Sequence, residues 1–289
     1  MAEPWSEWPA PAKLNLFLHI VGRRADGYHL LQTVFQLLDW GDTVRLRLRD
    51  DEAIVRVSGL AEVPPEQDLA VRAAIALRRA TGKARGADIG IEKCIPSGGG
   101  LGGGSSDAAT VLVALNELWE TGLSEDDLAQ IGLTLGADVP VFVRGHSAWA
   151  EGIGEKLTPV ELPPRHYVIL DPQVRVPTAE LFQAVELTRN TPPLTIYGYL
   201  NGAQAANAFA PVVRARYRQV AAALDWLQSY GDARLSGSGA CVFAAMDAEV
   251  AQRAEQDCPP QFAVYRADGV SRSPVLDARD NFRAQVRRI

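Results

Sequence analysis

Alternation of apolar and polar residues near the start of the chain predicts a β-strand. In the segment PAKLNLFLHI, one predicted face carries Leu14, Leu16, Leu18 and Ile20, and the other carries Lys13, Asn15, Phe17 and His19. Similar apolar segments bounded by turn residues predict further strands. They lie at residues 33–51, 53–59, 87–95, 166–172 and 262–270, with a strand, tight turn and strand in ARLSGSGACVFAAM.

Helical spacing of apolar residues predicts helices between these strands. We expect them at 68–81, from 105 to about 119, at 124–135, 177–187, 212–230 and 248–258. Gly82 and Gly136 are typical helix terminators, and Ser124 with Asp127 has the spacing of a capping box. A hairpin is predicted around Arg144–His146, and a solvated end from Asp277 onward.

Strands and helices mix without a regular strand–helix–strand alternation, which favours an α+β fold with two lobes. The proline-rich segment PVELPPRH, residues 159–166, is the best candidate for a join between domains. We therefore predict an N-terminal lobe at 1–160 and a C-terminal lobe at 161–289.

Composition narrows the class of protein. The 289 residues are 47% hydrophobic, and the net charge of −6 argues against nonspecific nucleic-acid binding, which needs a basic surface. The three cysteines are widely separated and have no metal-ligand spacing, so they are expected to be reduced thiols of a cytoplasmic protein. No signal peptide and no membrane-spanning segment is predicted. The oligomeric state is left open between monomer and homodimer.

The segment PSGGGLGGGSSDAA concentrates six glycines in seven positions, directly between a predicted strand and a predicted helix. Ser105, Ser106 and Asp107 are all good N-cap residues for that helix. A glycine-rich turn that leads into a helix N-terminus presents free N–H groups and the positive end of the helix dipole to an anion, above all a phosphate. The predicted phosphate loop comprises Pro96, Ser97, Gly98, Gly99, Gly100, Leu101, Gly102, Gly103, Gly104, Ser105 and Ser106.

Three well-known phosphate-binding motifs do not fit this loop. A dinucleotide-binding fold requires a second parallel strand with an acidic residue after the helix, whereas a second helix is predicted here. The only Gly-Lys pair, Gly82-Lys83, is followed by Ala84, so there is no Walker motif. The HRD and DFG motifs of protein kinases are absent as well.

The chain instead resembles the GHMP family of small-molecule kinases. The resemblance rests on three motifs, PAKLNLFLHIVGRRADGYHLLQTVFQ, PSGGGLGGGSSDAATVL and LSGSGACVFA, and on GADVPVFVRG and VPTAELFQAVELTRNTP. They follow one another over almost the whole chain. The first motif points to the branch of the family whose substrates carry a cytidyl diphosphate group.

This resemblance implies a fold and a reaction. The N-terminal lobe would be like ribosomal protein S5 domain 2, the C-terminal lobe would be ferredoxin-like, and the site would lie between them. ATP with Mg²⁺ would phosphorylate a hydroxyl group of the small substrate. The family's catalytic pair falls on Asp138, which would accept the hydroxyl proton, and on Lys13, which would stabilise the charges. Asn15 would orient the hydroxyl.

The resemblance also implies a cytosine site. Tyr28 and Phe182 would face the two sides of the base, and His29 would bind its edge. Gly237 and Gly239 would form a turn that supports the first motif and the phosphates. Asp68 stands where an asparagine beside the adenine is expected, and Asp107 is either a helix cap or a magnesium ligand.

Simpler interpretations exist for the same residues. Lys13 alone would be a solvated residue at a strand end, and Asp138 alone would cap a short helix that begins at Pro140. Tyr28 would pack over a turn, and Phe182 would belong to a helix core. Two other functions remain possible for the chain: a GHMP kinase for another alcohol and a noncatalytic nucleotide-binding protein.

Overall fold

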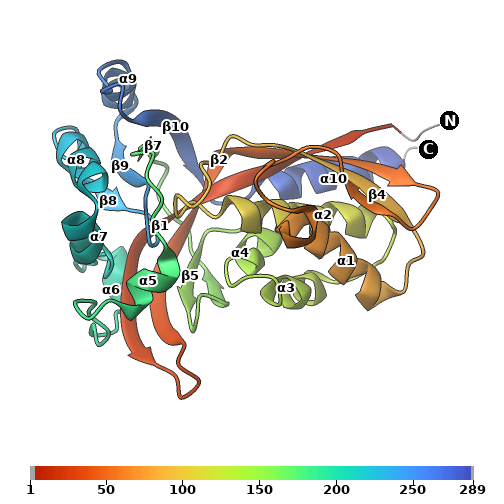
Figure 1. The fold of residues 1–289 in the computed structure, drawn as a ribbon, viewed down its shortest axis with the longest axis horizontal. Coiled ribbons are helices and arrows are strands. Elements are labelled where there is room, and N and C mark those ends of the chain that lie inside the picture. Colours follow the sequence, from red (N-terminus) through yellow and green to blue (C-terminus); the bar gives the residue numbers. More distant parts are fainter. Residues whose placement is uncertain (1–3, 288–289) are drawn as a thin grey trace.

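The computed structural model describes residues 4–287, and two long antiparallel strands run through the length of the molecule (Figure 1). These are β1 (Ser6–Arg23) and β2 (His29–Arg49). Within the described residues, ten strands join one mixed sheet, because β10 (Ala263–Val270) pairs with both β2 and β7 (His166–Asp171). The remaining strands are β3 (Ile54–Arg56), β4 (Gly86–Glu92), β5 (Ala148–Glu151), β6 (Lys156–Pro159), β8 (Arg234–Leu235) and β9 (Val242–Met246).

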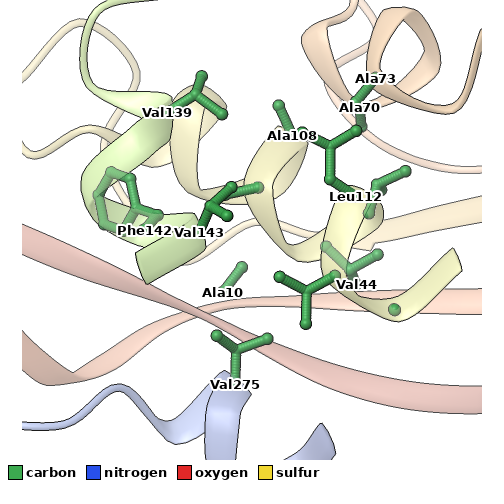
Figure 2. Close-up of a cluster of buried hydrophobic side chains, with 14 of the residues drawn as sticks. Ala10, Val44, Ala70, Ala73, Ala108, Leu112, Val139, Phe142, Val143 and Val275 are labelled. Carbon is green, nitrogen blue, oxygen red and sulfur yellow. The ribbon is translucent and has the colours of Figure 1, made fainter. Parts of the chain in front are cut away.

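The first hydrophobic core lies around one buried helix of the N-terminal half, and the last helix of the chain packs there as well (Figure 2). The buried helix is α2 (Gly103–Leu118), whose residues 106–116 are all buried because it contacts the sheet and several helices. Its neighbours are α1 (Leu69–Thr81), α3 (Glu125–Leu133), α4 (Val139–Arg144) and α10 (Pro274–Val286); a short 3₁₀ helix, Pro65–Gln67, precedes α1.

Apolar helix faces in the C-terminal half cover the sheet formed by β7, β9 and β8. This second core includes buried residues from α5 (Thr178–Gln183), α7 (Ala210–Arg216), α8 (Arg218–Leu227) and α9 (Ala248–Gln256). The small helix α6 (Ile196–Leu200) packs instead against β1, β2 and β5 through Phe17, Val34 and Trp149.

Several local predictions are confirmed. The helix α1 ends at Gly82, which has φ of +66°, and Ser124 and Asp127 form the reciprocal hydrogen bonds of a capping box on α3. The strand, turn and strand of the third motif are β8 and β9. The mixed sheet with helices in two cores confirms the α+β class.

Two other local predictions are wrong. Residues 212–230 form two helices, because Tyr217 takes an extended backbone between α7 and α8 and packs against the second core. The hairpin lies at β5 and β6, and Arg144 ends the helix α4 before Gly145. Residues 277–287 are largely exposed, as predicted for a solvated end, but they continue the helix α10, and Ala278 and Phe282 pack against the first core.

The predicted division at residue 160 falls between β6 and β7. The chain beyond residue 160 does not pack as one unit, because α10 lies against the core of the N-terminal half. The two domain ranges, 1–160 and 161–289, therefore stay a prediction. No helix in residues 4–287 is long and apolar enough to cross a membrane.

Candidate active site

Two irregularities in β1 shape the centre of the site. The pairing of β1 with β2 shifts register between Pro11 and Lys13 and again between Asn15 and Leu18. Such bulges re-aim side chains and free backbone groups from the strand ladder. The freed N–H of Lys13 donates to the carbonyl of Leu101 at 3.0 Å, so the strand is joined directly to the glycine loop.

The Lys13 ammonium lies in this junction and is not the solvated strand-end group of the simpler interpretation. Its side chain is buried, and it donates hydrogen bonds to Asn15 Oδ1 and, at 3.0 Å, to the carbonyl of Gly100. The third partner is the Asp138 carboxylate, with Oδ2 3.3 Å from Nζ. Lys13 thus connects the first motif, the loop and Asp138.

Asp138 reaches this position from the N-cap position directly before α4. Its backbone has helical angles, φ −85° and ψ −13°, and its side chain makes no capping hydrogen bond, so the capping interpretation is wrong. One third of the side chain is exposed, in contrast to the buried lysine. A carboxylate held by a buried cation and open to the cleft is a suitable proton acceptor for a bound hydroxyl.

Left-handed backbone at three glycines bends the loop around the cleft. Gly98, Gly100 and Gly102 have φ between +74° and +78°. A Cβ on Gly100 would lie 2.1 Å from the carbonyl oxygen of Ser236, so this position excludes any side chain. The helix α2 begins already at Gly103 with Gly102 as its cap. The predicted caps Ser105, Ser106 and Asp107 lie inside the helix, because the glycine backbone itself starts it.

The predicted turn at Gly237 and Gly239 packs against this loop. The Ser236 hydroxyl donates to the carbonyl of Gly100 at 2.9 Å and accepts from the N–H of Asn15 at 3.3 Å. A Cβ on Gly237 would approach Asn15 Oδ1 to 3.2 Å. The structure therefore brings the three sequence motifs together, as the resemblance predicts.

Sequence reasoning did not identify two hydroxyl groups in this network. Ser236 is part of the third motif, but only its position between Leu235 and Gly237 could have indicated it. Thr33 accepts a hydrogen bond from Asn15 Nδ2 at 3.0 Å and donates to the carbonyl of Phe17. No local pattern marks Thr33, because the pairing of β2 with β1 decides what it faces.

Two cavities meet at the glycine loop. A cavity of about 360 Å³ lies along the loop and includes Asp68, Lys93 and Asp107. A second cavity, of about 260 Å³, shares three of the glycines with it. Its walls combine the first, second and third motifs with α5: Lys13, Asn15, Thr33, Gly98, Gly100, Gly102, Asp138, Phe182, Gly237, Ser238 and Gly239. A larger cavity of about 690 Å³ around Trp5 and Phe282 includes none of these motif residues.

Behind the loop, Lys93 lies between two buried carboxylates. Its ammonium contacts Asp42 and, at 2.7 Å, Asp107 Oδ2. Although burial opposes it, the two carboxylates raise the pKa of Lys93 above its usual value. Burial raises the pKa of Asp107 to about 7. The Lys93 ammonium opposes this rise, and the negative charge of Asp42 adds to it.

Two buried oxygen atoms in the first turns of α2 have no hydrogen-bond partner: Ser106 Oγ and Asp107 Oδ1. Oxygen ligands of this kind suit Mg²⁺, which proteins commonly hold through one or two side chains together with substrate phosphates. No cluster of three or more His, Cys, Asp or Glu side chains suited to a metal occurs in residues 4–287. Asp107 also lines the cavity along the loop, so it is the candidate to face a magnesium–triphosphate group, whereas Ser106 is fully buried and lines neither cavity.

Asp68 is engaged in the local structure of α1. One carboxylate oxygen accepts from the N–H of Ala70 at 2.9 Å, and the other pairs with Arg56 at 2.7 Å. The carboxylate that stands in place of the expected asparagine is thus a helix cap neutralised by an arginine.

Of the three predicted cytosine residues, only Phe182 lines the second cavity, and the sequence did not indicate how the other two are arranged around it. The His29 ring is stacked on Phe182, with centroids 4.9 Å apart and planes at 23°. Tyr28 is 61% exposed on the preceding turn. Phe182 also contacts Phe209 edge to face, so it is only partly a core residue and lines the second cavity.

Comparison with known proteins agrees with this geometry. The family model for the GHMP kinase N-terminal domain matches residues 68–146, and the model for the GHMP kinase C-terminal domain matches residues 193–262. The chain belongs to the GHMP kinase family, as the three motifs predict.

Individual relatives narrow this class. A protein of Xanthomonas axonopodis pv. citri (strain 306) is 56% identical over 96% of this chain and 94% of its own length. One of Halorhodospira halophila (strain DSM 244 / SL1) is 56% identical over 94% of this chain and 95% of its own. Both are named 4-diphosphocytidyl-2-C-methyl-D-erythritol kinase. A crystal structure of 4-(cytidine 5'-diphospho)-2C-methyl-D-erythritol kinase, 32% identical, covers 92% of this chain and 100% of its own with a TM-score of 0.77.

Proposed function

We propose that this chain transfers the γ-phosphoryl group of ATP to the 2-hydroxyl of 4-diphosphocytidyl-2-C-methyl-D-erythritol. The observation that carries the proposal is the contact of the Lys13–Asp138 pair with the glycine loop, in a cleft that also includes Phe182. The names of relatives that match almost the whole chain support the same reaction.

The chemistry follows from the positions of these groups. The substrate hydroxyl lies against Asp138, which accepts its proton as the oxygen attacks the γ-phosphorus. The bond between that phosphorus and the β,γ-bridging oxygen breaks, and ADP leaves with the electron pair. Lys13 offsets the negative charge that develops on the attacking oxygen. Phosphoryl transfer needs little more from a protein than positioning and charge stabilisation.

The phosphates occupy the glycine loop, where backbone N–H groups and the start of α2 meet an anion. Mg²⁺ bound with ATP neutralises part of the triphosphate charge. Asp107, whose Oδ1 has no hydrogen-bond partner, is the residue that would hold it. Asn15 is fixed by Thr33 and by the Ser236 hydroxyl, and we assign it to orienting the substrate hydroxyl.

We further propose that Tyr28, His29 and Phe182 hold the cytosine of the substrate. Binding energy from this remote end helps to position the 2-hydroxyl. We also place the reaction in the cytoplasm, since the three cysteines, Cys94, Cys241 and Cys258, are free thiols. A monomer or a homodimer is expected.

A coupled assay of ADP release over a panel of polyols and their cytidylylated forms tests the reaction. We expect turnover of the diphosphocytidyl compound and almost none of methylerythritol 4-phosphate or homoserine. Comparable kcat/KM for the first two compounds would contradict the assignment of the cytosine residues. Turnover of homoserine alone would favour a GHMP kinase for another alcohol, and ATP binding without any turnover would favour a noncatalytic protein.

A further inference from the structure

Arg189 lies on the segment that follows α5 and uses its guanidinium to hold this side of the cleft together. Its Nη1 donates to the carbonyl of Leu187 at 3.0 Å, and Nη2 donates to the carbonyls of Phe182 at 3.0 Å and Ala184 at 2.6 Å. The remaining contact crosses to the first motif, where Nε donates to His29 Nε2 at 3.3 Å. One side chain thus joins two of the predicted cytosine residues.

This contact determines which nitrogen of His29 carries the proton. A guanidinium has only donors, so His29 Nε2 must be the acceptor in the hydrogen bond. The neutral ring then carries its proton on Nδ1, which makes no hydrogen bond within the described part of the chain. Burial first, and then the positive charges of Arg189 and Arg23, lower the pKa of His29, which favours this neutral form.

We infer that Arg189 sets the base preference of the cleft by fixing His29 as a hydrogen-bond donor at Nδ1. The inference rests on the proposed function. Cytosine and uracil differ at ring position 3, where cytosine has a lone pair and uracil has an N–H group. A fixed donor at Nδ1 pairs with cytosine and meets a second donor in uracil. Leaving a donor against a donor is costly in a desolvated contact.

Arg189 is therefore a positioning residue, and a structural role alone predicts a different result. If Arg189 only tied the loop together, its removal would weaken cytidyl and uridyl substrates equally. If it fixes the tautomer, its removal lets the His29 ring present either a donor or an acceptor. The discrimination between the two bases then falls, in addition to any loss of affinity.

The test compares Arg189→Met with wild type on diphosphocytidyl- and diphosphouridyl-methylerythritol. We expect the cytidyl-to-uridyl ratio of kcat/KM to fall by about tenfold or more, while kcat for the cytidyl substrate stays within a few-fold. Arg216→Met is the matched control, because Arg216 pairs with Glu186 on the same segment at 2.8 Å without contacting His29. It should leave the ratio unchanged. A ratio unchanged in Arg189→Met would overturn the inference.

A spectroscopic measurement on the wild-type protein tests the inference without any substitution at Arg189. The chain has four histidines, so ¹⁵N-labelled histidine spectra can be assigned to His29 by comparison with His29→Gln. We expect an unprotonated Nε2 and a protonated Nδ1 near pH 7.5. The opposite tautomer would overturn the inference. Failure of the proposed function is distinguishable, since wild-type protein would then phosphorylate neither substrate.

Discussion

Replacement of Asp138 by asparagine separates its catalytic role from its contribution to stability. Asparagine has nearly the same size but cannot accept the hydroxyl proton and carries no charge to pair with Lys13. Loss of a general base lowers a rate by about 10²–10⁴-fold. We therefore expect kcat to fall by about a hundredfold or more while substrate affinity changes little, because phosphate and base contacts lie elsewhere in the cleft.

The effect of Asp138→Asn on stability should be small, and the structure gives the reason. Lys13 loses one of three partners but keeps the acceptors on Asn15 and Gly100. The lost carboxylate is one third exposed, so water screens much of its attraction to the lysine. We expect a loss of about 1 kcal/mol, which lowers the melting temperature by roughly 2–4 °C.

Single-turnover kinetics and melting curves on two variants check this reasoning. The matched control is Asp88→Asn, because Asp88 is a buried carboxylate paired with Arg47 and Arg49 at 2.6 and 2.7 Å, between β2 and β4. It should lower the melting temperature more than Asp138→Asn and leave kcat within a few-fold. A rate for Asp138→Asn within a few-fold of wild type would refute the assignment of the base.

Two further predictions concern the glycine loop and its surroundings. Gly98→Ala should weaken ATP binding by about tenfold or more in an equilibrium titration, because Gly98 has φ of +74°, which an alanine disfavours, while its Cβ would meet no protein atom within 4 Å. Gly82→Ala is the matched control and should bind normally, because Gly82 has a similar φ of +66° and the same open space but lies at the end of α1, outside the loop. Gly102→Val is less suitable, since a Cβ there lies 2.8 Å from the Phe142 ring and a loss of ATP binding could not be separated from a loss of stability. Burial raises the pKa of Asp107 to about 7, against about 3.9 in the unfolded chain. Above pH 7 the buried carboxylate is charged and destabilises the ligand-free fold, and this destabilisation decreases as the pH falls and the carboxylate is protonated. Protonation of Asp107 should therefore add about 1 kcal/mol to the free energy of unfolding when the pH is lowered from 7.5 to 6. If Asp107→Asn gains the same stability between these pH values, the gain does not come from Asp107.

Local sequence signals predicted the elements that local interactions determine. The end of α1 at Gly82 and the capping box of Ser124 and Asp127 depend on residues within a few positions of each other. The place of the glycine loop between a strand and a buried helix was also predicted correctly, since β4 precedes it and α2 follows it, and its binding of phosphates stays a prediction. The roles of Lys13 and Asp138 came from the family resemblance alone, because each residue by itself fits a simpler interpretation.

Long-range packing decided the features that the sequence did not reveal. Tyr217 interrupts a regular amphipathic pattern because the second core binds it in an extended conformation. The sequence did not indicate that the last helix begins before Asp277, where its first turn buries Val275 and Leu276 in the first core. The His29–Phe182 stack joins residues more than 150 positions apart. Partners at such distances leave no local period or spacing in the chain.

The carbonyl of Gly100 explains why the three motifs function together. It accepts a hydrogen bond from the Lys13 ammonium and another from the Ser236 hydroxyl, and each donor belongs to a different motif. In the proposed function the N–H groups of the same loop bind the phosphates, so a shift of the loop would also move the partner of the proposed catalytic lysine. Lys13 lies on β1, which is held by its long antiparallel pairing with β2. In the proposed reaction, phosphate binding and the placement of the lysine charge would thereby be coupled through the carbonyl oxygen of Gly100.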